Sequence, residues 1–200
     1  MIIQPIVEGA GDFYAIPVLL RRICYEMQCG LGAVIATPMK VPRSQMVKEE
    51  CFKHYVRIAN SQPGCKLILL FMDADDDCAK AVSEKLRFWI GEEALCVKCE
   101  IIVIPREYEC WLIAALESLR GMRGISEKAI SHTCPERVRN PKIILTKLME
   151  GSAAYHESAD QAALTDRLDL DVVRQKCKSF RRLVAKIENS FAGDPPLVHP

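Results

Sequence analysis

The sequence has no long hydrophobic run and no excess of charge of either sign. Its uncharged apolar stretches, such as residues 67–72, are short, whereas a membrane-spanning helix needs about 20 predominantly apolar residues. No basic segment followed by an apolar one stands at the start, so we expect no secretory signal and a cytoplasmic protein. The chain has 27 basic and 26 acidic residues, and half of its residues are hydrophobic. This balance excludes disorder as the main state and predicts a globular protein.

Glycine, proline and cysteine are too few to define a special class. Ten glycines and 11 prolines exclude collagen-like and low-complexity chains, and ten cysteines among 200 residues are too few for a disulfide scaffold. One Cys-x-x-Cys pair, Cys96 and Cys99, has only His132 and Cys134 as distant companions. We interpret the cysteines as reduced core or surface thiols rather than as a structural zinc site.

Several motifs for nucleotide binding and nucleophilic catalysis are absent. No Gly-x-x-x-x-Gly-Lys-Ser/Thr occurs, so the chain has no P-loop. The Gly9-Ala10-Gly11 stretch lacks the third glycine of a dinucleotide fingerprint, because Tyr14 stands at that position. No Gly-x-Ser-x-Gly nucleophile elbow exists either.

Strand-like and helical periodicities alternate through the first half. We expect strands at 2–7, 33–37, 66–72 and 99–104, and helices at 16–27, 47–58, 78–90 and 108–119. This alternation predicts an α/β fold of the Rossmann-like kind, with a parallel sheet of about four strands flanked by helices.

The second half predicts a helical C-terminal extension. It contains a helix from Pro141 to Met149, a polar segment at 151–165 that we interpret as a loop, and one long amphipathic helix at 171–191. We therefore divide the chain into a catalytic domain, 1–120, and a helical extension, 121–200, packed on it.

Acidic residues follow three of the expected strands. They are Glu8, then Asp73 and Asp75, then Glu107 and Glu109. Sites in parallel open sheets form beyond the carboxyl ends of the strands, and a strand order of 2-1-3-4 would bring Glu8 beside the aspartates. Clustered carboxylates without His or Cys favour Mg²⁺ or Mn²⁺ over zinc.

Each acidic motif also has a plainer interpretation. The Asp73–Asp77 run is compatible with a solvated turn, Glu8-Gly9 with a tight strand-to-helix turn, and Glu107 and Glu109 with a favourable helix start. An Asp-x-Asp also occurs in phosphatases and nucleotide-sugar transferases. A metal site is favoured because the three acidic motifs occur together at successive strand ends.

The same residues carry a family resemblance. Glu8-Gly9 after a first strand and Asp73-x-Asp75 after a later one resemble the TOPRIM domain of topoisomerases, primases and overcoming-lysogenization-defect (OLD) nucleases. Glu8-x-x-x-Asp12 resembles the OLD-type branch in particular. The segments 105–111, 141–142 and 179–182 resemble DUF4276, a small TOPRIM-like family, along nearly the whole chain.

The resemblance implies a metal-dependent nuclease that uses two Mg²⁺ or Mn²⁺ ions. Asp73 and Asp75 would be primary ligands, with Glu8 as a ligand or general base. Further ligands would be Asp12 and one of Glu107 and Glu109, of which we favour Glu109. Lys142 would assist the transition state. The resemblance also implies a prokaryotic anti-phage defence effector that acts with a separate ATPase, on DNA rather than RNA. A homo-oligomer is compatible with these expectations.

The expected helix at 171–191 has a basic face. Arg174, Lys178, Arg181 and Arg182 lie outside its apolar stripe and are candidates for contacting a phosphate backbone. The same face would also suit an acidic partner or plain solvation. Two other functions therefore stay open for the chain, a non-catalytic TOPRIM-like subunit that binds nucleic acid or a partner, and a small-molecule phosphoesterase.

Overall fold

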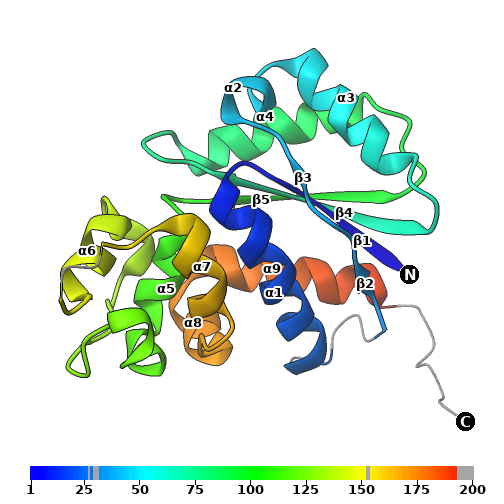
Figure 1. Cartoon of the computed structure of the whole chain (residues 1–200). Coiled ribbons are helices and arrows are strands. Elements are labelled where there is room, and N and C mark those ends of the chain that lie inside the picture. The colour runs from blue at the N-terminus through cyan, green and yellow to red at the C-terminus, as the bar shows by residue number, and fades with distance from the viewer. Residues whose placement is uncertain (27, 29–31, 152–153, 193–200) are drawn as a thin grey trace, which may run out of the picture.

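The computed structural model describes residues 1–26, 28, 32–151 and 154–192, and it has the expected α/β architecture (Figure 1). The strands are β1 (Ile2–Val7), β2 (Val34–Ile35), β3 (Met39–Lys40), β4 (Cys65–Asp73) and β5 (Lys98–Ile104). All pairs are parallel, and the order is β2-β1-β4-β5, with β3 also pairing with β1. The strands expected at 2–7 and 66–72, β1 and β4, are thus neighbours, which is the adjacency that brings Glu8 beside the aspartates.

The second strand differs from the prediction because it is broken into two pieces. β2 pairs with Ile2 and Ile3, and β3 pairs with Ile6 and Val7. Pro5 lies opposite the gap between them, where a residue without a backbone N–H breaks the ladder least. The buried Gln4 side chain bridges the gap by donating to the carbonyls of Pro5 and Thr37, at 2.9 and 3.0 Å.

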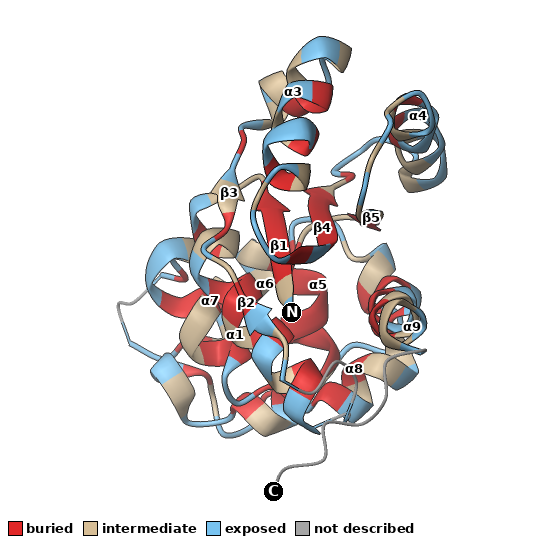
Figure 2. Ribbon diagram, turned by 90° about the vertical axis from the view of Figure 1, so that its right-hand side faces the viewer, coloured by how far each residue is buried: buried red, intermediate tan, exposed pale blue. Residues whose placement is uncertain are grey.

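Helices cover both faces of the sheet (Figures 1 and 2). One layer contains α2 (Arg43–Met46), α3 (Glu49–Asn60) and α4 (Ala79–Gly91). The other contains α1 (Ala10–Glu26), α5 (Glu109–Ala114), α6 (Pro141–Leu148), α7 (Glu157–Thr165), α8 (Leu170–Lys176) and α9 (Lys178–Phe191). Two apolar clusters result, one on each face, because strand side chains alternate between the faces. No helix of the described residues is long and apolar enough to cross a membrane.

The prediction of a loop at 151–165 is wrong, because residues 157–165 form α7. This helix packs along α1, and its polar residues Asp160, Gln161 and Thr165 are buried rather than exposed to solvent. Asp160 pairs with Arg123 at 2.7 Å, and the Thr165 hydroxyl bonds with the buried Tyr108 hydroxyl at 2.7 Å. A helix whose buried polar residues bond to distant partners has the polar composition of a loop, so the sequence pattern did not distinguish the two.

The prediction of one helix at 171–191 is also wrong, since the chain becomes extended at Cys177 between α8 and α9. The Glu136 carboxylate accepts hydrogen bonds from the backbone N–H groups of Lys178 and Ser179, at 2.9 and 2.7 Å. It thereby caps the N-terminus of α9, and a carboxylate is favourable at that end of a helix.

The helix expected at 108–119 ends early for a similar reason. α5 stops at Ala114, and a 3₁₀ turn (Leu116–Leu119) follows. The Ile113 carbonyl accepts from the His132 N–H at 2.9 Å, and the Leu116 N–H donates to the Ser131 hydroxyl at 2.8 Å. These two bonds take the place of bonds that would continue the helix. Two further short 3₁₀ turns lie at Met122–Gly124 and Pro135–Arg137.

Candidate active site

A polar cavity of about 120 Å³ opens at the carboxyl ends of β1, β4 and β5. Its lining residues come from both halves of the chain. They are Glu8, Gly9, Asp12, Asp73, Asp75, Tyr108, Glu109, Lys142, Glu157 and Gln161. The structure therefore brings most of the predicted site residues together, and it adds two acidic or polar side chains from α7.

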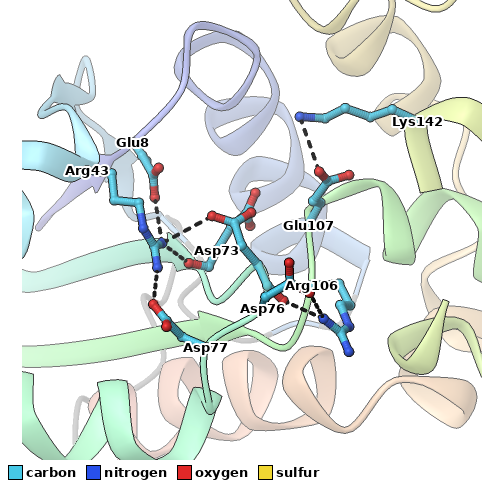
Figure 3. Close-up of polar contacts among 9 residues, drawn as sticks. Glu8, Arg43, Asp73, Asp76, Asp77, Arg106, Glu107 and Lys142 are labelled. Carbon is cyan, nitrogen blue, oxygen red and sulfur yellow. Dashed lines mark hydrogen bonds and ion pairs between the residues drawn. The ribbon is translucent and has the colours of Figure 1, made fainter. Parts of the chain in front are cut away.

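Arg43 lies between acids that follow β1 and β4 (Figure 3). Its guanidinium lies 3.7 Å from the Glu8 carboxylate and 3.5 Å from the Asp75 carboxylate. It also donates to the backbone carbonyl of Asp73 and pairs with Asp77 at 2.6 Å. The sequence reasoning missed Arg43, and its place just after β3, at the same end of the sheet, is the signal that could have found it.

The four aspartates at the end of β4 and in the loop after it lie in different surroundings. Asp73 and Asp75 line the cavity, whereas the Asp76 side chain is 91% exposed and pairs with Arg106 at 2.8 Å. Asp75 has a left-handed backbone (φ 50°), and its N–H donates to the Arg106 carbonyl at 3.1 Å. Arg106 thus holds the turn that presents Asp73 and Asp75 to the cavity.

The side chains of Glu107 and Glu109 differ in burial and in their contacts with the cavity. Glu109 is 1% exposed, lines the cavity and accepts a hydrogen bond from the Tyr155 hydroxyl at 2.8 Å. Glu107 is half-buried, lies outside the cavity lining and has its carboxylate 3.9 Å from the Lys142 ammonium. Burial raises the pKa of Glu109 to about 7, while that of Glu107 is also raised by burial.

Lys142, at the start of α6, lies on the opposite side of the cavity from Arg43 (Figure 3). Its ammonium contacts the Glu157 carboxylate at 2.5 Å. Burial alone would lower the pKa of Lys142, but the nearby carboxylates of Glu109, Glu157 and Glu107 raise it. Lys142 therefore stays charged and balances part of the acidic cluster.

The helix α7 completes the site by contacting Asp12. The Asp12 carboxylate accepts from the Gly9 N–H at 3.2 Å and from the Gln161 amide at 3.0 Å. Gln161 and Glu157 had not been predicted, because their segment was interpreted as a loop. No local sequence signal marks them, since only packing of α7 against α1 brings them to the cavity.

The acids of the cavity destabilise each other's charged forms. Burial raises the pKa of Glu8, and Asp75 and Asp12 raise it further, while Arg43 opposes them. The pKa of Asp73 is raised well above its ordinary value by burial, followed by repulsion from Asp12, Glu109 and Glu8. The pKa of Asp12 is raised chiefly by burial. Such a cluster favours the uptake of protons or of a cation.

The donor chemistry of the cavity fits a hard divalent cation. Its lining contains several carboxylates but no His or Cys, and buried oxygens of Glu8 and Glu109 have no hydrogen-bond partner among the described residues. Nevertheless, no three His, Cys, Asp or Glu side chains of the described residues surround one point closely enough to hold an ion. Several of the carboxylates are oriented toward Arg43 or Lys142. To bind a divalent cation, these side chains would have to change rotamer.

Comparison with family models decides which family the chain represents. The model of DUF4276, described as a domain of unknown function, matches residues 7–188. The chain belongs to the DUF4276 family. No curated protein and no solved structure matches it. The match spans the acids of the cavity and also the helices α6 to α8, so the region that completes the site belongs to the DUF4276 unit.

The basic residues predicted to bind nucleic acid have mixed surroundings in this DUF4276 protein. Arg174 pairs with Glu188 at 3.3 Å, and the Arg181 guanidinium donates to the carbonyls of Arg174 and Gln175 at the end of α8. Lys178 and Arg182 are exposed, and their side chains form no ion pair with another residue in the described part of the chain. Their role in binding nucleic acid stays a prediction, whereas Arg181 has a structural role at the α8–α9 junction.

Close packing of α1 against α7 requires a glycine at position 11. A Cβ atom there would lie 1.8 Å from the Gln161 side-chain oxygen and 2.8 Å from the Glu157 Cβ. We therefore expect Gly11→Ala to lower the free energy of unfolding by about 1–3 kcal/mol, the usual cost of overpacking. Thermal or urea unfolding measures this change.

Gly91→Ala is the matched control, because a Cβ atom at Gly91 would meet no atom within 4 Å. Gly91 also lies in a helix, α4, where alanine is intrinsically favourable. Equal stabilities of the two variants would show that α7 does not pack on α1 as described.

Proposed function

We propose that this protein is a Mg²⁺- or Mn²⁺-dependent nuclease that hydrolyses phosphodiester bonds of nucleic acid, DNA rather than RNA, in the cytoplasm. The observation that carries the proposal is the convergence of Glu8, Asp12, Asp73, Asp75 and Glu109 in one cavity beside Lys142. These residues come from the carboxyl ends of β1 and β4 and from the first turns of α1 and α5, where ligand sites of such sheets form. The resemblance of the Glu8 and Asp73-x-Asp75 motifs to TOPRIM and OLD-type nucleases supports the same activity.

The acids would divide between two cation positions. Glu8, Asp73 and Asp75 would hold one cation, and Asp12 and Glu109 would contribute to a second. Bound divalent cations supply charge stabilisation to phosphoryl oxygens and lower the pKa of water. One carboxylate oxygen each of Glu8 and Glu109 accepts no hydrogen bond and is available for this role without the loss of one.

The two basic side chains that flank the acidic cluster, Lys142 and Arg43, suit a phosphate group. Lys142 approaches the cavity from α6, so its ammonium is placed to bind a non-bridging phosphate oxygen. Arg43 contacts three acids and a carbonyl, and its planar guanidinium could exchange these partners for phosphate oxygens. The chain thereby offers positive charge to the substrate on both sides of the acidic cluster.

We further propose that the protein is the effector of a prokaryotic anti-phage defence system and acts with a separate ATPase. An unregulated cytoplasmic nuclease would damage its host, and the sequence has no P-loop with which to couple cleavage to ATP. The isolated chain is therefore expected to have weak activity that a partner increases.

The decisive experiment combines metal binding with cleavage. Calorimetric titration of the purified protein with Mn²⁺ or Mg²⁺ is expected to show binding in the micromolar to millimolar range. Plasmid DNA, single-stranded DNA, RNA, bis(p-nitrophenyl) phosphate and p-nitrophenyl phosphate then serve as substrates, with EDTA as the control. We expect metal-dependent cleavage of DNA and of the phosphodiester.

Each other outcome assigns the site differently. Hydrolysis of the phosphomonoester alone would replace the proposal with a small-molecule phosphoesterase. Nucleic-acid binding without cleavage of any substrate would favour a non-catalytic subunit. Absence of metal binding at millimolar concentrations would refute the metal site itself.

A further inference from the structure

A second hollow lies at the free edge of the sheet and shares no lining residue with the acidic cavity. It is a groove of about 370 Å³ between α4 and α9, and Ile101, Ile102 and Val103 of β5 form its floor. Both helices pack on β5, with α4 over one face of the sheet and α9 over the other. Figure 2 shows β5 at the edge of the sheet between these two helices.

The strand at the bottom of the groove pairs on one side only. β5 is the last strand in the sheet order, and within the described residues its sole partner is β4. One edge of β5 therefore presents backbone N–H and C=O groups that no neighbouring strand pairs. Such an edge is a template for another extended chain.

The walls of the groove are basic. Lys80 and Arg87 project from α4, and Arg182 and Lys186 project from α9, against a single acid, Glu84. Lys80 lies 3.7 Å from Glu84, and Lys186 is paired with Glu100 of β5. Arg87 and Arg182 are exposed on opposite walls, which leaves a positive charge on each side of the strand edge.

We propose that this groove binds an extended acidic segment of a partner protein, which adds to the sheet as a strand beside β5. Main-chain hydrogen bonds to β5 would provide the affinity, and alternate side chains would meet the basic walls. A partner rich in Asp or Glu complements Arg87 and Arg182. The apolar floor favours Val or Ile at the intervening positions.

Two other occupants fit the groove less well. A second copy of this chain, paired edge to edge through β5, would bring Arg87 and Arg182 of both copies together, and like charges repel. A nucleic acid would match the positive charge, but its phosphates only accept hydrogen bonds. The edge of β5 offers both donors and acceptors, which an extended peptide backbone pairs in full.

The test selects phage-displayed random octapeptides on the full-length protein. We expect sequences that alternate Val or Ile with Asp or Glu. Synthetic versions are then measured by fluorescence anisotropy against the wild type, the groove variant Arg87→Glu/Arg182→Glu, and the control Arg21→Glu/Lys128→Glu. The control changes the net charge equally at exposed residues that line neither the groove nor the acidic cavity.

The groove variant is expected to bind the selected peptide at least tenfold more weakly, while the control keeps the wild-type affinity. On the wild type, we expect one of the two peptides that are N-methylated at either alternate set of amides to bind at least tenfold more weakly, because only one set faces β5. Hydrogen exchange of the amides of 101–103 should slow when the unmodified peptide binds. This arm uses the unmodified protein, so it holds even if the groove variant folds poorly.

Any of four results would overturn the proposal. They are the absence of acidic peptides after selection, equal binding by the groove and control variants, unchanged binding of both N-methylated peptides, and protection of 101–103 by a 20-nucleotide single-stranded DNA in place of the peptides. The last result would assign the groove to nucleic acid.

Discussion

Asp73→Asn is expected to lower the rate of metal-dependent cleavage by about three orders of magnitude, which corresponds to about 4 kcal/mol of transition-state stabilisation. Asp73 lines the acidic cavity at the end of β4, and it interacts electrostatically with Asp12, Glu109 and Glu8. Asparagine has the same shape but lacks the charge that would hold a divalent cation. Initial rates with bis(p-nitrophenyl) phosphate at several Mn²⁺ concentrations measure the loss.

Asp76→Asn is the matched control, because it makes the same chemical change three residues further along the loop. The Asp76 side chain is exposed, faces Arg106 and does not line the cavity. We expect its rate to stay within about twofold of the wild type, since exposed ion pairs contribute little. Equal rates for Asp73→Asn and the wild type would place the catalytic centre elsewhere.

The stability of the protein in EDTA is expected to fall as the pH rises from about 4.5 to about 7. The pKa of Glu109 is about 7 in the folded protein against an ordinary value of 4.5, so the folded state binds more protons over this interval. Because stability decreases with pH wherever the folded state holds more protons, the free energy of unfolding should drop by up to about 3 kcal/mol. The raised pKa values of Glu8 and Asp73 act in the same direction.

Urea unfolding at pH 5 and pH 8 measures this dependence. Glu109→Gln should reduce it, because the amide does not titrate and its oxygen can still accept the Tyr155 hydroxyl. A saturating concentration of Mg²⁺ should also raise the stability at pH 8, since binding to the folded state stabilises it by mass action. A pH dependence that is the same in Glu109→Gln and the wild type would contradict the assignment to the acidic cluster.

The main elements of the sheet follow from local sequence patterns. Residues 2–7, 65–73 and 98–104 form strands within one or two residues of the predicted ranges, because their dense apolar runs are buried on both faces. The parallel arrangement follows from the helices between them. Parallel strands place their carboxyl ends at one edge, so a site at Glu8, Asp73 and Asp75 could be expected on the condition that their strands are neighbours, which the structure shows.

The completion of the cavity depends on contacts between residues that are far apart in the chain. Gln161 reaches Asp12 only because α7 packs closely on α1 at Gly11. Arg43 reaches Glu8 and Asp75 because the edge strand is interrupted opposite Pro5 and resumes as β3.

By itself, the sequence determined the α/β class, the positions of the long strands and the acids at their ends, because burial periodicity is a local property. Only the tertiary structure decided where helices end and which polar side chains face the cavity. Glu136 breaks the predicted long helix at Cys177 by capping α9, and α7 turns Glu157 and Gln161 inward. A hydrogen bond between distant residues leaves no periodic signal, so these features emerge only when the chain is folded.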